Sequence, residues 1–265
     1  MITSPGNARI KSVVHLRQKA RARKEADAFL VEGIKMFLEA PVQKIREVYV
    51  SESFSCQDVA MREAVNQKLK EVSFETVTEE VFRKMSDTCS PQGILCVMQA
   101  YHHTLDDMLK EENPLLLLLE SIQDPGNLGT MIRSGEGAGI HGVIMSSDTV
   151  DIYNPKTIRS TMGSVYRVPF LYTDNITGVM KTLKEKGIHT YAAHLDGKDT
   201  YDRLDFTGGS AFLIGNEGNG LKKETADAAE CYMKIPMLGR VESLNAGIAA
   251  SIVLYEAARQ RRKDT

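Results

Sequence analysis

Five consecutive leucines at residues 115–119 constrain the fold of this chain more than any other stretch of it. A strand that is apolar on both faces must be covered on both faces, which is typical of a parallel sheet between two layers of helices. No apolar run in the chain is longer, and five residues are far fewer than the roughly 20 that span a bilayer. We therefore expect an α/β fold with a buried central sheet and no membrane-spanning segment.

Strand and helix patterns alternate from residue 114 to the end of the chain, which predicts a doubly wound α/β domain with a parallel sheet. Ligands in such domains bind beyond the carboxyl ends of the strands, so the loops after Glu120, Ile214 and Ile235 should hold the site. Besides the leucine run, we expect strands at residues 142–147, 189–195, 210–215 and 231–236, and helices at residues 129–139, 154–164, 176–187 and 243–262.

The first hundred residues favour a smaller α/β unit, because strand and helix patterns alternate there too. The polar stretch 102–113 has few hydrophobic residues, and we interpret it as a linker. The predicted domains are therefore residues 1–101 and residues 114–265. In the first domain we expect strands at residues 29–33, 45–50, 74–77 and 93–100, and helices at residues 10–26, 34–40, 59–69 and 79–87, the last one capped by Thr78.

The net charge of −2 is small, but the charges are unevenly distributed. Seven lysines and arginines lie between Arg9 and Lys24, and no acidic residue precedes Glu25. Such a stripe can bind an RNA backbone, although the solvated face of a helix explains it equally well. The candidate RNA-binding residues are Arg9, Lys11, Arg17, Lys19, Arg21 and Arg23.

The cysteines and histidines do not form a recognisable metal-binding pattern. The four cysteines are scattered along the chain without a C-x-x-C pair. This argues against a zinc site or a disulfide framework and for a reducing cytoplasm. The six histidines do not have the spacing of metal ligands either. We expect no bound metal, and the absence of an apolar stretch at the N-terminus predicts no secretory signal.

The sequence GNEGNGLKKET at residues 215–225 is nearly a phosphate-binding loop. Leu221 stands where that motif requires its lysine, and the carboxylate of Glu217 would repel a triphosphate at close range. These two residues argue against a nucleotide-dependent enzyme. The loop suits a ligand that is cationic or rich in hydrogen-bond donors, although a glycine-rich turn with Glu217 capping the next helix is a simpler interpretation.

Residues 123–140 form a second candidate stretch, with glycines at 135, 137 and 139 that would let a helix approach another backbone closely. As a dinucleotide-binding fingerprint this stretch is weak. Asn127 either caps the helix or belongs to a site. Arg133 lies among small and apolar residues, and because a buried arginine needs an anionic partner, an RNA phosphate or a carboxylate is the partner we expect.

A third candidate stretch, residues 234–260, begins with a loop and continues as a long helix. Ser243 is explained most simply as the N-cap of that helix. A serine hydrolase is a poor interpretation, because no G-x-S-x-G motif and no acid–histidine pair accompany the serine. The small residues between Ala246 and Ser251 give the helix a slim face, which suits packing against a loop or a second subunit.

Together these stretches resemble the SpoU (TrmH-type) family of RNA ribose 2′-O-methyltransferases, in the SPOUT superfamily. The shared motifs are N-x-G-T-x-I-R-S-x-x-x-x-G at residues 127–139, I-G-N-E-G-x-G-L at 214–221 and I-P-M-x-G-x-V-E-S-L-N at 235–245. Near the N-terminus, N-A-R-I-K-x-V, F-L-V-E-G and P-Q-G-I-L resemble the family's RNA substrate-binding domain, which is similar to some ribosomal proteins. The resemblance thus covers almost the whole chain.

The resemblance implies a C-terminal α/β domain with a deep trefoil knot that binds S-adenosylmethionine, whose sulfonium cation suits the acidic glycine loop. Rules for ordinary folds would not predict a knot. The positions that match the family's cofactor-binding residues are Gly215, Asn216, Gly218, Ile235, Met237, Ser243 and Leu244. Those that match its catalytic and RNA-positioning residues are Arg133, Asn127, Glu217, Ser243 and Asn245.

The implied reaction is methyl transfer from S-adenosylmethionine to a ribose 2′-hydroxyl, with large-subunit ribosomal RNA as the expected substrate. The resemblance assigns proton removal to Arg133, but an arginine is effectively always protonated. Stabilising the developing alkoxide, or binding a neighbouring phosphate, is the easier role for it. Family members are homodimers, in which Arg133 and the cofactor pocket can come from different subunits.

Two alternatives remain open at this point. The substrate could be transfer RNA, although members that act on it often lack the N-terminal domain. The chain could also be an RNA-binding module without catalysis, whose mark would be a replaced Arg133, Glu217 or Asn245. All three residues are present, which favours an active enzyme.

Overall fold

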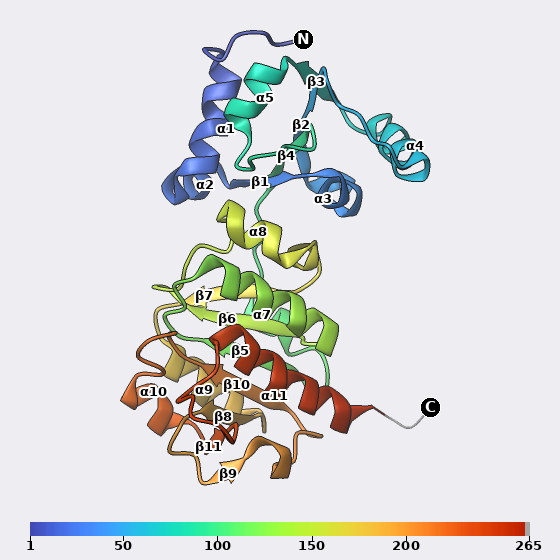
Figure 1. Cartoon of the computed structure of the whole chain (residues 1–265). Helices are drawn as coiled ribbons and strands as arrows, with labels where there is room; N and C mark the ends of the chain where they lie inside the picture. Colours follow the sequence, from blue (N-terminus) through green and yellow to red (C-terminus); the bar gives the residue numbers. More distant parts are fainter. Residues whose placement is uncertain (263–265) are drawn as a thin grey trace. The chain divides into compact units, whose positions relative to one another are not determined.

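The computed structural model describes residues 1–262, which form two compact units (Figure 1). The first contains Met1–Tyr101 together with Asp151–Tyr166, and the second contains His102–Val150 and the chain from Arg167 onward. Residues 151–166, expected within the second domain, thus belong by their contacts to the first unit. The predicted domain boundaries, at residue 101 before the 102–113 linker and at residue 114 after it, remain predictions.

The first unit is built on a four-stranded sheet in the order β1-β4-β2-β3, in which only β2 and β3 are parallel. Its core lies between the sheet and two helices, because α1 contributes Ile10 and Val13, and α5 contributes Phe82 and Met85. Thr78 caps α5 as predicted, accepting a hydrogen bond from the N–H of Val81. The strands are β1 (Ala28–Glu32), β2 (Ile45–Ser51), β3 (Phe74–Val77) and β4 (Ile94–Gln99); the helices are α1 (Ala8–Gln18), α2 (Ala20–Ala26), α3 (Ile34–Glu39), α4 (Val59–Leu69), α5 (Glu79–Met85) and α8 (Pro155–Thr161).

The second unit is built on a seven-stranded parallel sheet in the order β7-β6-β5-β10-β8-β11-β9. All five leucines of β5 are buried, which confirms the prediction from the leucine run. Leu116 and Leu118 share a core with residues of α6, α9 and α10, whereas α7 and α11 pack against each other in front of the sheet in Figure 1. The strands are β5 (Leu115–Leu119), β6 (Gly142–Ser146), β7 (Phe170–Thr173), β8 (His189–Ala193), β9 (Asp199–Thr200), β10 (Ser210–Ile214) and β11 (Cys231–Lys234); the helices are α6 (Leu105–Met108), α7 (Pro125–Ala138), α9 (Ile176–Glu185), α10 (Lys223–Ala228) and α11 (Ala246–Arg261).

Several short elements differ from the sequence predictions. The helix expected over residues 10–26 is two helices, because Lys19 has an extended backbone between α1 and α2. The 102–113 stretch contains α6, whose Met108 is buried in the core of the second unit. The short strands β7 and β9 and the six-residue helix α10 were not predicted. Within residues 1–262, no helix combines the length and apolarity needed to cross a bilayer.

Candidate active site

Three loops at the carboxyl ends of β5, β10 and β11 meet around a cavity of about 540 Å³. These are the loops expected from the strand pattern, and the volume lies within the range of roughly 300–1,000 Å³ that is typical of small-molecule sites. Each loop contributes polar side chains. The lining residues are Gln123, Asp124, Asn127, Glu217, Ser243, Leu244, Asn245 and Ala246.

Glu217, in the loop after β10, accepts hydrogen bonds from the segment after β5 and thereby joins two of these loops. Its Oε1 accepts hydrogen bonds from the N–H of Asp124 at 3.1 Å and from Nδ2 of Asn127 at 3.0 Å, and its Oε2 accepts one from the N–H of Gln123 at 3.1 Å. Partial burial alone would raise the pKa of Glu217, but the hydrogen bonds from Asn127 and these backbone groups outweigh it and hold the pKa below its ordinary value. The carboxylate is therefore ionised at neutral pH.

Asn245 connects the third loop to the same group of residues. Its Nδ2 donates to Oδ1 of Asn127 at 2.9 Å, while its Oδ1 accepts from the N–H groups of Gly247 and Ile248 at the start of α11. Asn245, Asn127 and Glu217 thus form one directional chain of hydrogen bonds. Since the amide of Asn127 can donate to Glu217 only while its oxygen accepts from Asn245, each side chain determines the orientation of the next.

Two helix caps differ from the sequence interpretation. The N-cap of α11 is Asn245, two residues after Ser243, and Ser243 instead lines the cavity. The N-cap of α7 is Asp124, whose side chain accepts a hydrogen bond from the N–H of Asn127 at 2.8 Å. Asn127 therefore lies inside α7, where its amide is available to the cavity.

The 215–221 loop is closed on itself rather than open for a phosphate. The backbones of Asn216 and Gly220 exchange two hydrogen bonds, of 3.0 and 2.9 Å. A Cβ atom added at Gly215 would lie 2.2 Å from the backbone of Gly220 and of Leu221, so only glycine fits there. Of the predicted cofactor-binding positions, Ser243 and Leu244 line the cavity. The remaining ones lie outside its lining: Gly215, Asn216, Gly218, Ile235 and Met237.

Arg133 lies on α7, one and a half helical turns beyond Asn127, and is exposed in the single chain. The expectation of a buried arginine is therefore wrong. The buried face of α7 is formed by residues such as Leu128, Met131 and Ile132, and position 133 lies off that face. Within residues 1–262, the guanidinium of Arg133 has no hydrogen-bonding or ion-pair partner.

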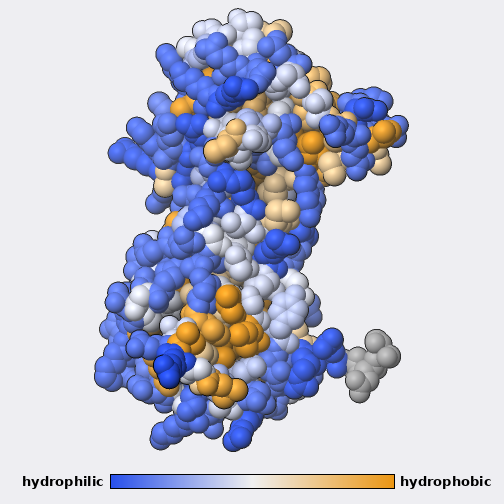
Figure 2. All heavy atoms as spheres, viewed as in Figure 1, coloured by the Kyte–Doolittle hydropathy of each residue, from blue (hydrophilic) through white to orange (hydrophobic). Residues whose placement is uncertain are grey.

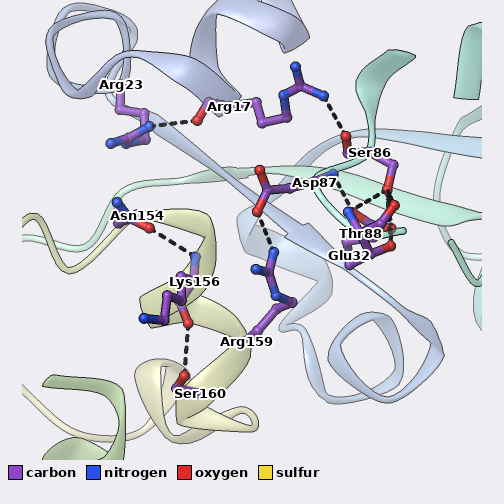
Figure 3. Close-up of polar contacts among 10 residues, drawn as sticks. All are labelled: Arg17, Arg23, Glu32, Ser86, Asp87, Thr88, Asn154, Lys156, Arg159 and Ser160. Carbon is purple, nitrogen blue, oxygen red and sulfur yellow. Dashed lines mark hydrogen bonds and ion pairs between the residues drawn. The ribbon is translucent and has the colours of Figure 1, made fainter. Parts of the chain in front are cut away.

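The predicted RNA-binding stripe is largely engaged within the first unit. Arg23 is only 5% exposed, forms an ion pair with Asp151 at 2.6 Å and donates to the carbonyl of Leu16, so it cannot face an RNA. Arg9 pairs with two glutamates, and Arg21 pairs with Glu25. Arg17 donates to the backbone carbonyls of Lys84 and Ser86, the second of which is shown in Figure 3. Lys11 and Lys19 are exposed.

The chemistry of the cavity fits S-adenosylmethionine better than a nucleotide triphosphate. In the described chain its lining carries carboxylates, amides and the apolar side chains of Leu244 and Ala246, but no lysine or arginine. An ionised Glu217 attracts a sulfonium cation and repels a phosphate. Residues 1–262 contain no group of three or more histidines, cysteines or carboxylates placed to hold a metal ion.

The sequence of residues 114–255 matches the family described as SpoU rRNA Methylase. The chain belongs to the SpoU rRNA methylase family. Residues 7–96 match a second family, the MRM3-like substrate binding domain. This SpoU-family protein is 30% identical to the 23S rRNA (guanosine(2553)-2′-O)-methyltransferase RlmP of Bacillus subtilis, over 96% of its own chain and 97% of the relative. It is 31% identical to the 23S rRNA (guanosine-2′-O-)-methyltransferase RlmB of Vibrio parahaemolyticus, over 87% and 95% of the two chains.

Solved structures of the SpoU family agree with this assignment. The SpoU methyltransferase AviRb of Streptomyces viridochromogenes, solved in complex with AdoMet, superposes with a TM-score of 0.86 at 28% identity, over 96% of this chain and 98% of AviRb. The predicted family, the α/β fold with an N-terminal substrate-binding domain, and S-adenosylmethionine as cofactor are thereby confirmed. This SpoU-family protein is a methyltransferase.

Proposed function

We propose that this protein transfers a methyl group from S-adenosylmethionine to a ribose 2′-hydroxyl of large-subunit ribosomal RNA. The observation that carries the proposal is the chain of hydrogen bonds from Asn245 through Asn127 to Glu217, at the edge of the sheet where a ligand is expected. Relatives that match nearly the full length of the chain are named as 23S rRNA guanosine 2′-O-methyltransferases. The N-terminal substrate-binding domain also favours ribosomal over transfer RNA.

The residues of the cavity would bind and orient the reactants. The cofactor supplies an activated methyl group on a sulfonium cation. Ser243 and Leu244 would hold it, and the ionised Glu217 of the 215–221 loop would favour its positive charge. The fixed amides of Asn127 and Asn245 would orient the ribose, so that its hydroxyl lies in line with the methyl group.

We also propose a homodimer in which Arg133 of one subunit serves the cavity of the other. Arg133 lies on α7 between Thr130 and Gly137, which face Gly247 and Tyr255 of α11. Figure 2 shows hydrophobic residues gathered where Figure 1 draws the start of α11. Ile248 and Tyr255 are each about half exposed, at 52% and 53%.

In such a dimer the exposed guanidinium of Arg133 would reach an anion outside its own chain. Because the group stays protonated, it would stabilise the developing alkoxide or bind a phosphate rather than act as a base. The trefoil knot and the cytoplasmic location remain predictions from the sequence.

The reaction is tested with the purified protein, methyl-labelled S-adenosylmethionine, and unmodified ribosomal and transfer RNA in separate reactions. Alkali cleaves RNA through the 2′-hydroxyl, so a methylated ribose yields a labelled, alkali-resistant dinucleotide. We expect that product from ribosomal RNA and not from the protein-free control. Label in mononucleotides would indicate base methylation, label only from transfer RNA would change the substrate, and no label with intact cofactor binding would favour an inactive RNA-binding module.

A further inference from the structure

Glu120 is a buried carboxylate outside the cavity, and it contacts both ends of the 215–221 loop. It is 2% exposed and directly follows β5. Its N–H donates to the carbonyl of Ile214, just before the loop, at 2.9 Å, and its Oε2 accepts from the N–H of Lys222, just after the loop, at 2.8 Å. Its Oε1 accepts from the hydroxyl of Thr225 at 2.6 Å.

The loop between these two ends has little conformational freedom, so it cannot easily adjust its backbone if the ends move apart. Its backbone is closed by the two hydrogen bonds between Asn216 and Gly220, and Gly215 lies against Gly220 and Leu221 with no room for a Cβ atom. The carbonyl of Ile214 and the N–H of Lys222, which both contact Glu120, therefore lie at the two ends of a tightly closed loop.

The same loop carries Glu217 into the cavity. Asn216 donates through Nδ2 to the carbonyl of Ser121 at 2.9 Å, and Glu217 accepts from the backbone of Gln123 and Asp124. Glu120, Asn216 and Glu217 thus join the segment after β5 to the segment after β10 at three successive points. Glu120 is the most deeply buried of these three residues.

We propose that Glu120 is a positioning residue for methyl transfer, which fixes Glu217 by holding the two ends of the 215–221 loop together. This inference rests on the proposed function. A carboxylate is suited to the position because it accepts from two donors at once, with the ammonium group of Lys222 at 4.0 Å. A glutamine of the same shape would present an N–H group to one of the two donors.

The protein contains a matched pair of buried threonines with which to test the contact. Thr225 is 1% exposed and donates to Glu120, whereas Thr190 is 2% exposed and its hydroxyl accepts from the N–H of Glu230 at 3.1 Å, near the amino end of β8. Thr225→Val and Thr190→Val each remove one hydrogen bond of a buried threonine side chain from the same unit. Only the first of them removes a contact of Glu120.

Hydrogen–deuterium exchange of the full-length protein tests the contact without requiring activity. In Glu120→Gln and Thr225→Val we expect the amides of Asn216 and Gly220 to exchange at least about threefold faster than in the wild type, because the loop opens locally more often. Thr190→Val should exchange there like the wild type. Unchanged exchange of the loop in both Glu120→Gln and Thr225→Val would overturn the proposal, whether or not the protein methylates RNA.

Steady-state kinetics at saturating RNA and cofactor test whether the contacts of Glu120 affect methyl transfer. We expect Glu120→Gln and Thr225→Val each to lower kcat about tenfold. In a protein that already carries Glu217→Gln, Glu120→Gln should lower kcat no further, because Glu120 acts through the position of Glu217. Independent, multiplicative losses would show that Glu120 does not act through Glu217. If the wild type methylates no RNA, the proposed function fails, while the exchange measurement still decides whether Glu120 holds the loop.

Discussion

At the residue scale, hydrogen-bond direction determines what the cavity can offer a ligand. Two ionised carboxylate oxygens provide roughly four acceptor sites. Three of those on Glu217 accept from the N–H groups of Gln123 and Asp124 and from the amide of Asn127. About one acceptor site is therefore left for a ribose hydroxyl or for the charge of the cofactor.

Replacing Glu217 by glutamine should reduce methyl transfer strongly. The amide has one oxygen for three donors, and its own N–H group would face one of them, which disturbs Asn127 and Asn245 in turn. We expect kcat to fall by about 10²-fold, similar to the loss of a hydrogen-bonding group in other active sites. The measurement is single-turnover transfer of labelled methyl to ribosomal RNA, and retention of more than half of the wild-type rate would contradict the assigned role.

The lowered pKa of Glu217 predicts how its contribution to stability depends on pH. A carboxyl whose pKa is lower in the folded state stabilises that state above its unfolded pKa, ordinarily 4.5 for this group, and the contribution is lost as the pH falls through the lower folded value. Urea unfolding should therefore show that Glu217→Gln is less stable than the wild type at pH 7. The difference should shrink below pH 4.5, and a difference that grows on acidification would contradict the hydrogen-bonding pattern.

The sequence motifs identified most residues of the candidate site, but they could not predict the directions in which the side chains point. Asn127, Glu217 and Asn245 line one cavity, as their positions after the strands suggested. Asp124 was missed, although an aspartate before a proline is a common start of a helix. The exposure of Arg133 could not be predicted from neighbours in sequence, because it depends on which face of α7 packs against the rest of the unit.

At the element scale, the 215–221 loop shows why glycine occurs where β10 ends. A methyl group at Gly215 would overlap the backbone of Gly220 and Leu221, and a backbone cannot move aside as the end of a side chain can. We predict that Gly215→Ala lowers the stability by about 1–3 kcal/mol, which is typical of overpacking, and strongly reduces methyl transfer.

Gly208→Ala is the control for this substitution, since a Cβ atom there would have no neighbour within 4 Å. The free energy of unfolding and the transfer rate of Gly208→Ala should match those of the wild type. If both alanine variants behaved alike, the close approach at Gly215 would not be what constrains the loop.

The elements predicted best from the sequence are those in which buried residues recur with every turn of a helix or every second residue of a strand. The fully apolar β5 and the strands beside it have that property. The edge strands β7 and β9 do not, because β7 has four residues with one of them buried and β9 has only two. Such short strands are defined by their neighbours in the sheet, which a local pattern does not contain.

At the scale of the whole molecule, the proposed homodimer predicts complementation between two inactive proteins. Arg133→Ala and Glu217→Gln should each abolish most methyl transfer while the cofactor still binds to Arg133→Ala. After equal amounts of the two variants have exchanged subunits, half of the dimers are mixed. Each mixed dimer contains one cavity with both residues intact, so about a quarter of the wild-type activity should return.

The activity of the mixture, compared with that of each variant alone, is the measurement. A mixture as inactive as its components would mean that Arg133 and Glu217 act within one subunit or that the protein is not a dimer. Sedimentation of the wild type and of Ile248→Asp, which places a charge on the exposed face of α11, distinguishes these two outcomes.

The chain path through the first unit limits how the protein can be divided. The chain returns to that unit at residues 151–166, where α8 packs against β1 and Arg159 forms an ion pair with Asp87 at 2.6 Å, as Figure 3 shows. A fragment that ends at residue 101 would lack one of its own helices, and a fragment that starts at residue 114 would carry that helix without its partner. Exchanging RNA specificity between relatives would therefore require grafting two separate segments of the gene.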